Sequence, residues 1–562
     1  MNIHSNKIPA QILSVAFIKA GIRDVVISPG SRNAPLIIEF TNQPEFNNYS
    51  IVDERVAGFF ALGMAQQKNK PVVLVCTSGS ALLNYYPAVA EAFYSQIPLI
   101  VVSADRPQKW VDQGEGQTIR QHNVFANHSW YNTTLSEGEN SKSVNENKQK
   151  IKQAIETAFE KKGPVHINIP FDEPLYETTE AKKVDFPEVQ TNYPSRIYEE
   201  KFLQNYVYKW NKASKIMILA GQYRPSEFLE KQLEKLSENP SVIVLNENIS
   251  NVHSEKFINN IDQAVFSLNE EELADLQPEI LITIGRNIIS KKIKNFLRKY
   301  KPAEHWHIEQ TGLPPDTFEA LTQHFNTTPE MFFSQFLFLI YDQMNKHSKY
   351  QEKWLAIKKE KKEKHRKYLA KTVFSDLKVF ELLSRYVPDD YILQWGNSAT
   401  VRYAQLFDFQ KNTIHFSNRG TSGIDGCTST AIGAAYISRR PVLAVSGDIS
   451  FLYDSNALWN KYIPENFKLI IINNGGGDIF NFIPGPGQIQ AKDEFFVTRH
   501  QLTAGKFAEM FNIKYQILNN LKDLEEILPA FMARNNQAEI LEINTRQIDN
   551  AGILKQYFKQ IQ

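Results

Sequence analysis

The sequence contains only two cysteines, Cys76 and Cys427, among 562 residues. Two cysteines cannot build a disulfide framework or a cysteine-based zinc site, and so few suit a reducing compartment. Continuous apolar runs are also short, because none approaches the ~18 residues of a membrane-spanning helix. The N-terminal segment spaces its apolar residues at helical intervals and lacks the unbroken apolar core of a signal peptide. These absences predict a cytoplasmic protein without membrane insertion.

The chain also lacks an excess of charge of either sign. It has 63 Lys and Arg against 62 Asp and Glu, which gives a formal net charge of +1. A nearly neutral chain has no overall field that attracts nucleic acid. The basic run KKEKKEKHRKY at 358–368 is interrupted by Glu360 and Glu363. It therefore favours a solvated helix joining two domains over a nucleic-acid patch, and we predict no nucleic-acid partner.

Several familiar catalytic motifs are missing as well. The sequence has no GxxxxGK[ST] loop, no GxGxxG after an apolar run, no HExxH and no GxSxG. Their absence argues against nucleotide hydrolysis, simple NAD chemistry, zinc proteolysis and serine hydrolysis.

Short runs rich in valine and isoleucine recur along the whole chain, separated by amphipathic stretches. Because these runs are apolar on both faces, they predict buried parallel strands. Their alternation with helical patterns predicts βαβ units and an α/β fold. The predicted strands are 24–28, 71–76, 98–104, 164–169, 215–220, 241–246, 279–285, 391–396, 413–417, 441–448, 468–474 and 539–544.

The length favours about three domains. Polar stretches without strand signal at 177–195 and 343–372 mark the expected boundaries. We predict domains at 1–180, 195–345 and 372–562, each with a central, mostly parallel sheet flanked by helices.

Two strand ends in the third predicted domain carry oxygen ligands. The run 441–448 ends in Gly-Asp, and 468–474 ends in Asn-Asn followed by three glycines, with one crossover helix expected around 453–462. Open α/β sheets bind ligands at such carboxyl ends. The Asp448 carboxylate, the Asn474 amide oxygen and the Gly476 carbonyl would suit a hard cation such as Mg²⁺ together with phosphate oxygens. Taken singly, each motif is equally an ordinary turn or helix cap.

Together, at this spacing, the two motifs resemble the diphosphate-binding signature of thiamine diphosphate enzymes. The resemblance implies thiamine diphosphate and Mg²⁺ or Mn²⁺ as cofactors, with the metal on Asp448, Asn474 and Gly476. It implies a cofactor site made of Glu54, Ser422, Gly423, Ile424, Gly447, Asp448, Ile449, Ser450, Asn474, Gly476, Gly477, Ile479 and Phe480. Phe480 and Ile483 would form apolar walls that exclude water.

Thiamine diphosphate also needs a carboxylic acid at its aminopyrimidine ring, in a desolvated pocket. Glu54 follows an expected strand at 49–53 and opens an apolar helix. Alone it would be a first-turn charge that the helix dipole favours, but beside the diphosphate signature it is the candidate acid. Ile424 lies on a glycine-flanked loop and could bend the cofactor, although a core isoleucine is an equal interpretation locally.

A more specific resemblance extends over the first and third predicted domains. Its motifs are SPGSRNAPL (28–36), VDERVAGFFALGMA (52–65), TSGSALLNYYPAVAEA (77–92), SADRP (103–107), GQTIRQ (116–121), GNSATVR (396–402), NRGTSGIDG (418–426), GDISFLYDSNALW (447–459) and NNGGGDIFNFIP (473–484). The chain resembles the 2-succinyl-5-enolpyruvyl-6-hydroxy-3-cyclohexene-1-carboxylate synthases of menaquinone biosynthesis. The resemblance implies pyrimidine-binding, middle and diphosphate-binding domains. It implies a transferase that decarboxylates 2-oxoglutarate and adds the succinyl carbanion equivalent to isochorismate in a 1,4-addition.

Both implied substrates are dicarboxylates, which arginine binds in a bidentate manner. Singly, each arginine after a strand is an ordinary surface residue, but as a set in matching motifs they predict anion binding. The resemblance implies that Gln117 lies near the reacting carbon, where a neutral amide would not protonate a carbanion. The implied catalytic residues are Glu54, Gln117, Arg402 and Arg419, and the implied substrate-binding residues are Ser31, Arg32, Arg106, Lys291, Lys292, Asn397 and Ser398.

The chain departs from the family at two places. Lys292 stands where the family has arginine, which puts bidentate binding there in doubt. Asp478 stands where some relatives have a neutral residue. The family also implies a homodimer or a dimer of dimers with the active site between subunits.

Two other functions remain open from the sequence. One is another thiamine diphosphate-dependent 2-oxoacid decarboxylase or an acetolactate-synthase-like carboligase, which would not need this many arginines. The other is an inactive relative used as a binding module, although retention of Glu54, Asp448 and Asn474 together argues against it.

Overall fold

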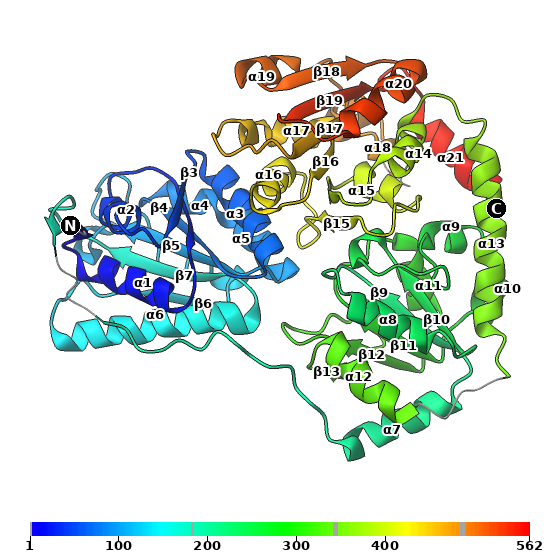
Figure 1. The fold of residues 1–562 in the computed structure, drawn as a ribbon, viewed down its shortest axis with the longest axis horizontal. Coiled ribbons are helices and arrows are strands. Elements are labelled where there is room, and N and C mark those ends of the chain that lie inside the picture. Colours follow the sequence, from blue (N-terminus) through cyan, green and yellow to red (C-terminus); the bar gives the residue numbers. More distant parts are fainter. Residues whose placement is uncertain (1–2, 181–184, 341–346, 483–484, 486–488) are drawn as a thin grey trace. The chain divides into compact units, whose positions relative to one another are not determined.

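The computed structural model describes residues 3–180, 185–340, 347–482, 485 and 489–562 (Figure 1). The chain groups into two compact units. Unit 1 comprises Met1–Tyr193, Asn418–Val442 and Leu452–Phe467, and unit 2 comprises Pro194–Ser417, Leu443–Phe451 and Lys468–Gln562. The predicted α/β class is confirmed. The domain boundaries stay a prediction, and residues 181–184 of the expected linker and the expected boundary at 345 lie outside the described residues.

Unit 1 is built on a six-stranded sheet in the order β3-β2-β4-β5-β7-β6. The strands are β2 (Asp24–Ile27), β3 (Asn47–Ser50), β4 (Val72–Cys76), β5 (Leu99–Asp105), β6 (Tyr131–Thr134) and β7 (Val165–Pro170), all paired in parallel. Helices α1 (Ile8–Lys19) and α6 (Ser141–Lys161) lie together against one face (Figure 1). Val73 and Val75 enter that core, while Val72 and Leu74 alternate with them and are equally buried, as expected of a strand covered on both faces.

Further elements complete unit 1. They are α2 (Ala34–Thr41), α3 (Glu54–Lys68), α4 (Ser80–Asn84), α5 (Tyr86–Ser95), α16 (Cys427–Ile437) and a small antiparallel pair of β1 (His4–Ser5) and β8 (Thr178–Thr179). Helices α3 and α16 cross at glycines. A Cβ atom on Gly63 would lie 2.0 Å from the carbonyl oxygen of Thr430, and one on Gly433 would lie 2.0 Å from that of Phe60. The backbones therefore approach too closely for any side chain.

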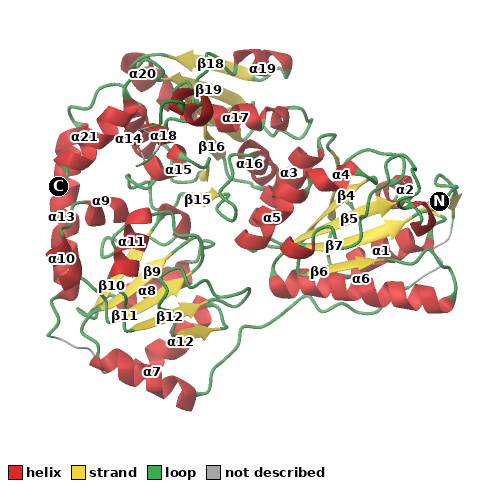
Figure 2. Cartoon of the chain, turned by 180° about the vertical axis from the view of Figure 1, so that it is seen from behind, coloured by secondary structure: helices red, strands yellow, loops and turns green. Residues whose placement is uncertain are grey.

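Unit 2 contains the sheet of the middle region, in the order β10-β9-β11-β12-β13. Its parallel strands are β9 (Ile216–Ala220), β10 (Val242–Asn246), β11 (Ile280–Ile284), β12 (Glu304–Ile308) and β13 (Gln323–Phe325). Ile216 and Ile218 face a core formed with α7 (Glu200–Lys212), α8 (Glu227–Leu236) and α12 (Pro329–Ile340). Met217 and Leu219 face a second core with α9 (Ile261–Phe266), α11 (Lys291–Lys299) and α13 (Tyr350–Leu369), and the sheet lies between these helices (Figure 2).

The third sheet has six strands in the order β15-β14-β16-β17-β19-β18. These are β14 (Ile392–Trp395), β15 (Ile414–Ser417), β16 (Val442–Gly447), β17 (Phe467–Asn473), β18 (Lys514–Leu518) and β19 (Glu539–Asn544). A core that includes Leu393, Leu443 and Ile470 packs against α14 (Asp376–Tyr386), α15 (Ala399–Ala404), α20 (Leu521–Met532) and α21 (Asn550–Gln560).

Each apolar run predicted as a strand contains one, but two local predictions are wrong. The strand before Glu54 is Asn47–Ser50 and not 49–53, because Asp53 already caps α3 by accepting a hydrogen bond from the Val56 N–H. The helix expected around 453–462 is instead α17 (Asp448–Tyr453) followed by a short 3₁₀ turn, Ser455–Leu458. Asp454, the residue after α17, accepts hydrogen bonds from the N–H and hydroxyl of Ser429 through its carboxylate.

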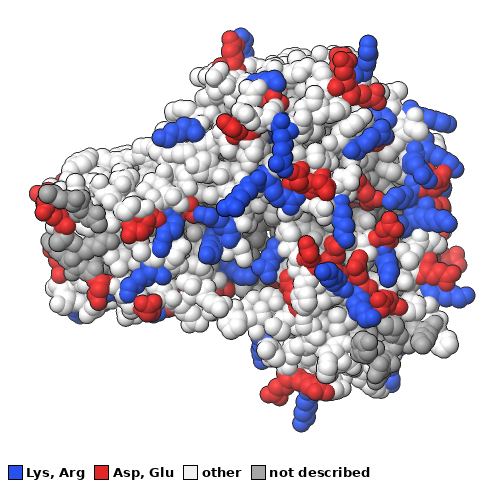
Figure 3. Space-filling model, viewed as in Figure 1, with Lys and Arg blue, Asp and Glu red and all other residues white. Residues whose placement is uncertain are grey.

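The charged run 358–368 forms part of α13, as the solvated-helix interpretation expects. Its basic side chains pair with nearby acids, as Lys364 does with Glu360 at 2.8 Å and Lys362 with Asp408 at 2.9 Å. Figure 3 shows acidic and basic side chains intermixed over this part of the surface. Among the described helices, none combines the length and the hydropathy of a membrane span.

Candidate active site

Asp448 joins the two strand-end loops that the sequence singled out. It directly follows β16, opens α17 and is only 3% exposed. Its Oδ2 atom accepts hydrogen bonds from the Gly475 N–H at 2.8 Å and the Gly476 N–H at 2.9 Å. Its Oδ1 atom accepts one from the Ile449 N–H at 2.7 Å and keeps acceptor capacity for a ligand.

Asn474 presents an amide oxygen with no partner. Its Nδ2 donates to Asp376 Oδ2 at 2.9 Å, whereas its buried Oδ1 atom has no hydrogen-bond partner among the described residues. Burying an unpaired acceptor is costly. A cation bound at Oδ1 would remove that cost.

Asp376 orients Asn474, and sequence reasoning missed it. It opens α14, and its Oδ1 atom accepts a hydrogen bond from the Thr545 hydroxyl at 2.6 Å. Burial raises the pKa of Asp376 to about 7, against the lowering effect of the hydrogen bonds from Thr545 and Asn474. No local motif marks this residue, because Asn474 lies far downstream in the sequence.

The glycine loop after β17 brings backbone groups to the same place. Gly476 has φ +151°, and a Cβ atom there would lie 2.5 Å from the carbonyl oxygen of Val497. The Gly477 N–H donates to that same carbonyl at 2.6 Å, which fixes the loop. The Gly476 carbonyl accepts a hydrogen bond from the Asp478 N–H at 3.0 Å and keeps a second lone pair.

The oxygen atoms of Asp448, Asn474 and Gly476 suit a magnesium ion bound to a diphosphate. The described residues contain no group of three or more His, Cys, Asp or Glu side chains that could hold a metal by themselves. One carboxylate, one amide oxygen and one carbonyl suit Mg²⁺, which takes its other ligands from phosphate and water. His500 Nε2 lies 3.3 Å from Asp448 Oδ2 and is a neighbour that the sequence did not indicate.

The other predicted cofactor residues of unit 2 flank this centre. Gly447 ends β16, and Ile449 and Ser450 follow Asp448 in α17. Gly477 precedes α18 (Ile479–Phe482), in which the Phe480 ring packs edge-on against Phe496. Ile483 lies outside the described residues.

Asp478, the unusual residue of this loop, bonds locally. Its Oδ1 atom accepts a hydrogen bond from Asn481 Nδ2 at 2.6 Å, one turn into α18. Burial raises the pKa of Asp478. Its hydrogen bond to Asn481 joins the start of α18 to that helix's own side chain, so the structure gives Asp478 a local contact.

The predicted substrate residues of unit 2 lie after β14 and at the start of α11. Asn397 is buried and accepts a hydrogen bond from the Ser417 hydroxyl at 3.4 Å. Ser398 has φ +68°, and its carbonyl accepts a hydrogen bond from the Arg402 guanidinium. Arg402 therefore folds back over the turn that carries its neighbours.

Lys292 and Arg402 both act on one buried carboxyl group. Burial raises the pKa of Asp262, and the charges of Lys292 and Arg402 oppose that rise. The Lys292 ammonium also lies 4.3 Å from the centre of the Phe266 ring. Lys291 precedes it, and both lysines are exposed in the first turn of α11.

Glu54 stands at the first position of α3 in unit 1. Its carboxylate is half-buried, and Oε2 accepts a hydrogen bond from Asn84 Nδ2 at 3.2 Å. Burial raises the pKa of the nearby Cys76 thiol and Tyr85 hydroxyl, and the charge of Glu54 adds to both rises. The carboxylate thus lies beside the buried end of β4.

Arg32 and Arg106 lie close together in unit 1, with Asp172 and Glu173 near Arg32. Arg32 is 5% exposed and donates to the Phe171 carbonyl at 2.9 Å. Burial lowers the pKa of Arg32, and the charge of Arg106 lowers it further. Glu173, at 3.1 Å from Arg32, opposes that effect only in part. Two adjacent guanidinium groups attract an anion.

The remaining predicted residues of unit 1 lie on loops. Ser31 is exposed beside Arg32, and Gln117 is exposed with φ +56°. The loop 418–426 carries the others, namely Arg419, Ser422, Gly423 and Ile424. The predicted residues are thus divided between the two units.

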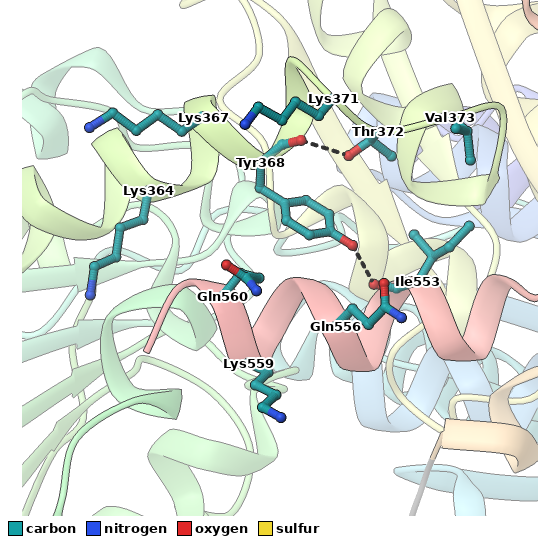
Figure 4. Close-up of a pocket in the computed structure, with 10 residues that line it drawn as sticks. All are labelled: Lys364, Lys367, Tyr368, Lys371, Thr372, Val373, Ile553, Gln556, Lys559 and Gln560. Atoms are coloured by element: carbon teal, nitrogen blue, oxygen red, sulfur yellow. Dashed lines mark hydrogen bonds between the residues drawn. The ribbon is translucent and has the colours of Figure 1, made fainter.

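A separate cavity of about 800 Å³ lies between α13 and α21. Lysines line much of it, and Figure 4 shows their ammonium groups pointing in different directions. Tyr368 bridges the two helices through a hydrogen bond to the Ile553 carbonyl at 3.0 Å. Because the charges do not converge on one point, this surface has the character of a solvated helix pair.

Comparison with known proteins identifies the chain. Residues 10–124 match the model described as "Thiamine pyrophosphate enzyme, N-terminal TPP binding domain", 189–394 match "Middle domain of thiamine pyrophosphate" and 396–543 match "Thiamine pyrophosphate enzyme, C-terminal TPP binding domain". Curated relatives named 2-succinyl-5-enolpyruvyl-6-hydroxy-3-cyclohexene-1-carboxylate synthase match over nearly the whole chain. They include proteins of Flavobacterium psychrophilum (51% identical, 96% of each chain covered), Flavobacterium johnsoniae (50%, 96% of each) and Porphyromonas gingivalis (39%, 99% of this chain and 98% of the relative). The chain belongs to this synthase family.

The predicted cofactor residues of both units fall within thiamine pyrophosphate binding models. The N-terminal and C-terminal thiamine pyrophosphate binding models cover Glu54 and the Asp448–Asn474 pair respectively. The family assignment and the thiamine diphosphate prediction are confirmed. The individual site residues stay predictions of this synthase's chemistry.

Proposed function

We propose that this chain converts 2-oxoglutarate and isochorismate into 2-succinyl-5-enolpyruvyl-6-hydroxy-3-cyclohexene-1-carboxylate and CO₂ in menaquinone biosynthesis. The observation that carries the proposal is the unpaired Asn474 Oδ1 atom beside the Asp448 carboxylate, in a chain 51% identical to a synthase of that name. Thiamine diphosphate, when bound, supplies a carbon nucleophile and an electron sink.

The residues of this chain would position that cofactor and the substrates. Asp448, Asn474 and Gly476 would hold Mg²⁺ or Mn²⁺ on the diphosphate. Glu54 would hold a proton at the aminopyrimidine ring, which its place at the start of a buried helix supports.

Arginines would bind the substrate carboxylates. Arg32 and Arg106 provide an adjacent pair of cations, Arg402 lies in α15, the short helix after β14, and Arg419 lies on the loop after β15. Gln117 would face the reacting carbon as a neutral amide. Ser31, Asn397 and Ser398 would orient substrate oxygens, and Lys291 and Lys292 would extend the cationic surface of unit 2.

We further propose that the active site forms between two copies of the chain, in a homodimer or a dimer of dimers. Glu54 belongs to unit 1 and Asp448 to unit 2, so one cofactor requires residues from both units. The cytoplasmic location stays a prediction, supported by two free, buried cysteines.

A coupled assay tests the function. Purified protein is supplied with 2-oxoglutarate, isochorismate, thiamine diphosphate and Mg²⁺, and each component is omitted in turn. We expect product only when all four are present, and pyruvate should not replace 2-oxoglutarate. CO₂ release from pyruvate that exceeds release from 2-oxoglutarate would favour the alternative, a decarboxylase or acetolactate-synthase-like carboligase.

A further inference from the structure

A buried glutamate holds the loop that carries several of the predicted site residues. Glu91 lies in α5 and is 1% exposed. Its Oε1 atom accepts a hydrogen bond from the Gly420 N–H at 2.8 Å, and its Oε2 atom accepts one from the Thr421 N–H at 2.7 Å. The Thr421 hydroxyl donates to Oε2 at 2.9 Å, and the Ser95 hydroxyl donates to Oε1 at 2.6 Å.

Both carboxyl oxygens of Glu91 act as acceptors of a backbone N–H group. Four donors point at two oxygens, which uses the acceptor capacity of a carboxylate and exceeds that of an amide. Among the described residues no Lys, Arg or His lies within ion-pair distance of Glu91, so backbone N–H groups compensate its charge. Hydrogen bonds to an ionised group are stronger than neutral ones, and buried ones are costly to break.

The backbone at the contact is equally constrained. A Cβ atom on Gly420 would lie 2.6 Å from the Glu91 carbonyl oxygen and 2.9 Å from the Ser95 hydroxyl. Only glycine lets the loop approach α5 this closely. The contact therefore depends on residues from two motifs, YYPAVAEA in the first part of the chain and NRGTSG in the third.

We infer that Glu91 is a positioning residue for the reaction, and this inference rests on the proposed function. Its two backbone hydrogen bonds lie between Arg419 on one side and Ser422, Gly423 and Ile424 on the other. Arg419 is the proposed carboxylate ligand, and Ile424 is the proposed support of the bent cofactor. Glu91 fixes the backbone on which both depend and so acts through the loop.

The test replaces Glu91 by glutamine, which keeps the size of the side chain. One acceptor oxygen becomes an NH₂ group, which cannot accept the hydrogen bond from the Gly420 or the Thr421 N–H. We expect kcat/KM for 2-oxoglutarate and isochorismate to fall about 10- to 100-fold, as expected when one or two charge-assisted hydrogen bonds are lost. We also expect the amides of Gly420 and Thr421 to exchange with deuterium at least ~10-fold faster in protein without cofactor.

Glu39→Gln is the matched control. Glu39 is also fully buried and accepts hydrogen bonds from the Ser14 hydroxyl at 2.6 Å and the Ser5 N–H at 3.1 Å, away from the loop. We expect this variant to lose stability while exchange of 418–426 stays at the wild-type rate. A second variant, Thr421→Val, removes only the hydroxyl bond and should give a smaller effect in the same direction, which keeps the test available if Glu91→Gln does not fold.

The outcomes separate the two proposals. If the wild-type protein makes no product but Glu91→Gln accelerates loop exchange, the proposed function fails and the anchoring contact stands without a catalytic role. If the wild-type protein is active and Glu91→Gln changes neither kcat/KM nor exchange, or changes them no more than Glu39→Gln does, the positioning role is overturned.

Discussion

Buried carboxylates in this protein fasten loops and a helix start by accepting backbone N–H groups. Glu91 holds the loop 418–426, Asp448 holds Gly475 and Gly476, and Asp454 holds Ser429. Glu247 does the same for Ile289 and Ser290, at 2.7–2.9 Å. Each contact joins segments that are separated in sequence, so no local motif predicts the pair, although the glycines that contact Glu91 and Asp448 are visible in the sequence.

Asp454 allows a test of this arrangement by pH. Burial raises its pKa from the usual 3.8 to about 7, so the folded protein binds this proton more tightly than the unfolded chain. The stability it contributes is therefore fully present below about pH 4 and is lost as the pH rises toward 7. We expect Asp454→Asn, which can keep both contacts to Ser429, to gain stability relative to wild type by on the order of 2 kcal/mol over this range.

Urea denaturation at about pH 4 and about pH 8 measures that difference. Asp523→Asn, at an exposed helix N-terminus, serves as the control and should show no comparable change across the range. A constant stability difference between wild type and Asp454→Asn at both pH values would contradict the prediction.

At the scale of elements, the strands that read as apolar runs were predictable, including the edge strands β10 and β15, whereas the edge strands β6, β13 and β18 were not. Strands β4, β5 and β9 are buried on both faces and read as apolar runs. In contrast, β6, β13 and β18 lie at sheet edges and contain half-exposed polar residues. An edge strand pairs on one side only and needs less apolar sequence, so its pattern is weaker.

One central strand was missed for a different reason. Strand β12 carries His305 and His307, which are buried against the Thr283 hydroxyl at 2.9 and 2.8 Å. Burial lowers the pKa of His305 to about 4, which keeps the ring neutral inside the sheet. Hydrogen-bonded polar side chains inside a sheet make a strand look as polar as a loop when only its hydropathy is considered, so β12 was missed.

The candidate site shows the same division between what sequence reveals and what it hides. Asp448, Asn474 and Gly476 were found because their ligand chemistry requires those residue types at two strand ends. Asp376, His500 and Glu91 were missed because they act by holding other residues, and only the fold brings them there.

The crossing of α3 and α16 makes a prediction at this scale. Gly433→Ala places a methyl group 2.0 Å from the Phe60 carbonyl oxygen, which no rotamer change can relieve. We expect the helices to separate and stability to fall by about 1–3 kcal/mol, the usual cost of overpacking. Thermal denaturation measures the loss.

Gly116→Ala is the control, because a Cβ atom there meets nothing within 4 Å. It should leave the unfolding midpoint close to that of wild type. An equal midpoint for Gly433→Ala would show that the two backbones are further apart than described.

At the scale of the whole molecule, the division into two units leads to a complementation test. We expect Glu54→Gln and Asp448→Asn each to lower turnover by orders of magnitude. If one site takes Glu54 from one subunit and Asp448 from the other, a mixed dimer contains one intact site and one doubly altered site. Random mixing in equal amounts should then restore about a quarter of wild-type activity.

The two variants are unfolded together and refolded, or co-expressed with different tags, and the mixed species is assayed after isolation. Recovery of activity only in the mixed species supports the shared site. Mixed dimers as inactive as either parent would contradict it and would assign both residues to one chain's own site.

Because unit 1 is made of three separate segments of the chain, it cannot be produced as one continuous fragment. The chain passes between the units repeatedly, so α16 and the segment 452–467 belong with the first sheet although they lie beyond residue 417. A fragment cut after Tyr193 would keep α3 but lose α16. The surface of α3 around Gly63 and Phe60, which α16 contacts, would then be exposed to solvent. Such a truncation should aggregate or misfold, and an expression strategy for separate modules would have to splice 418–442 and 452–467 back onto the amino-terminal piece.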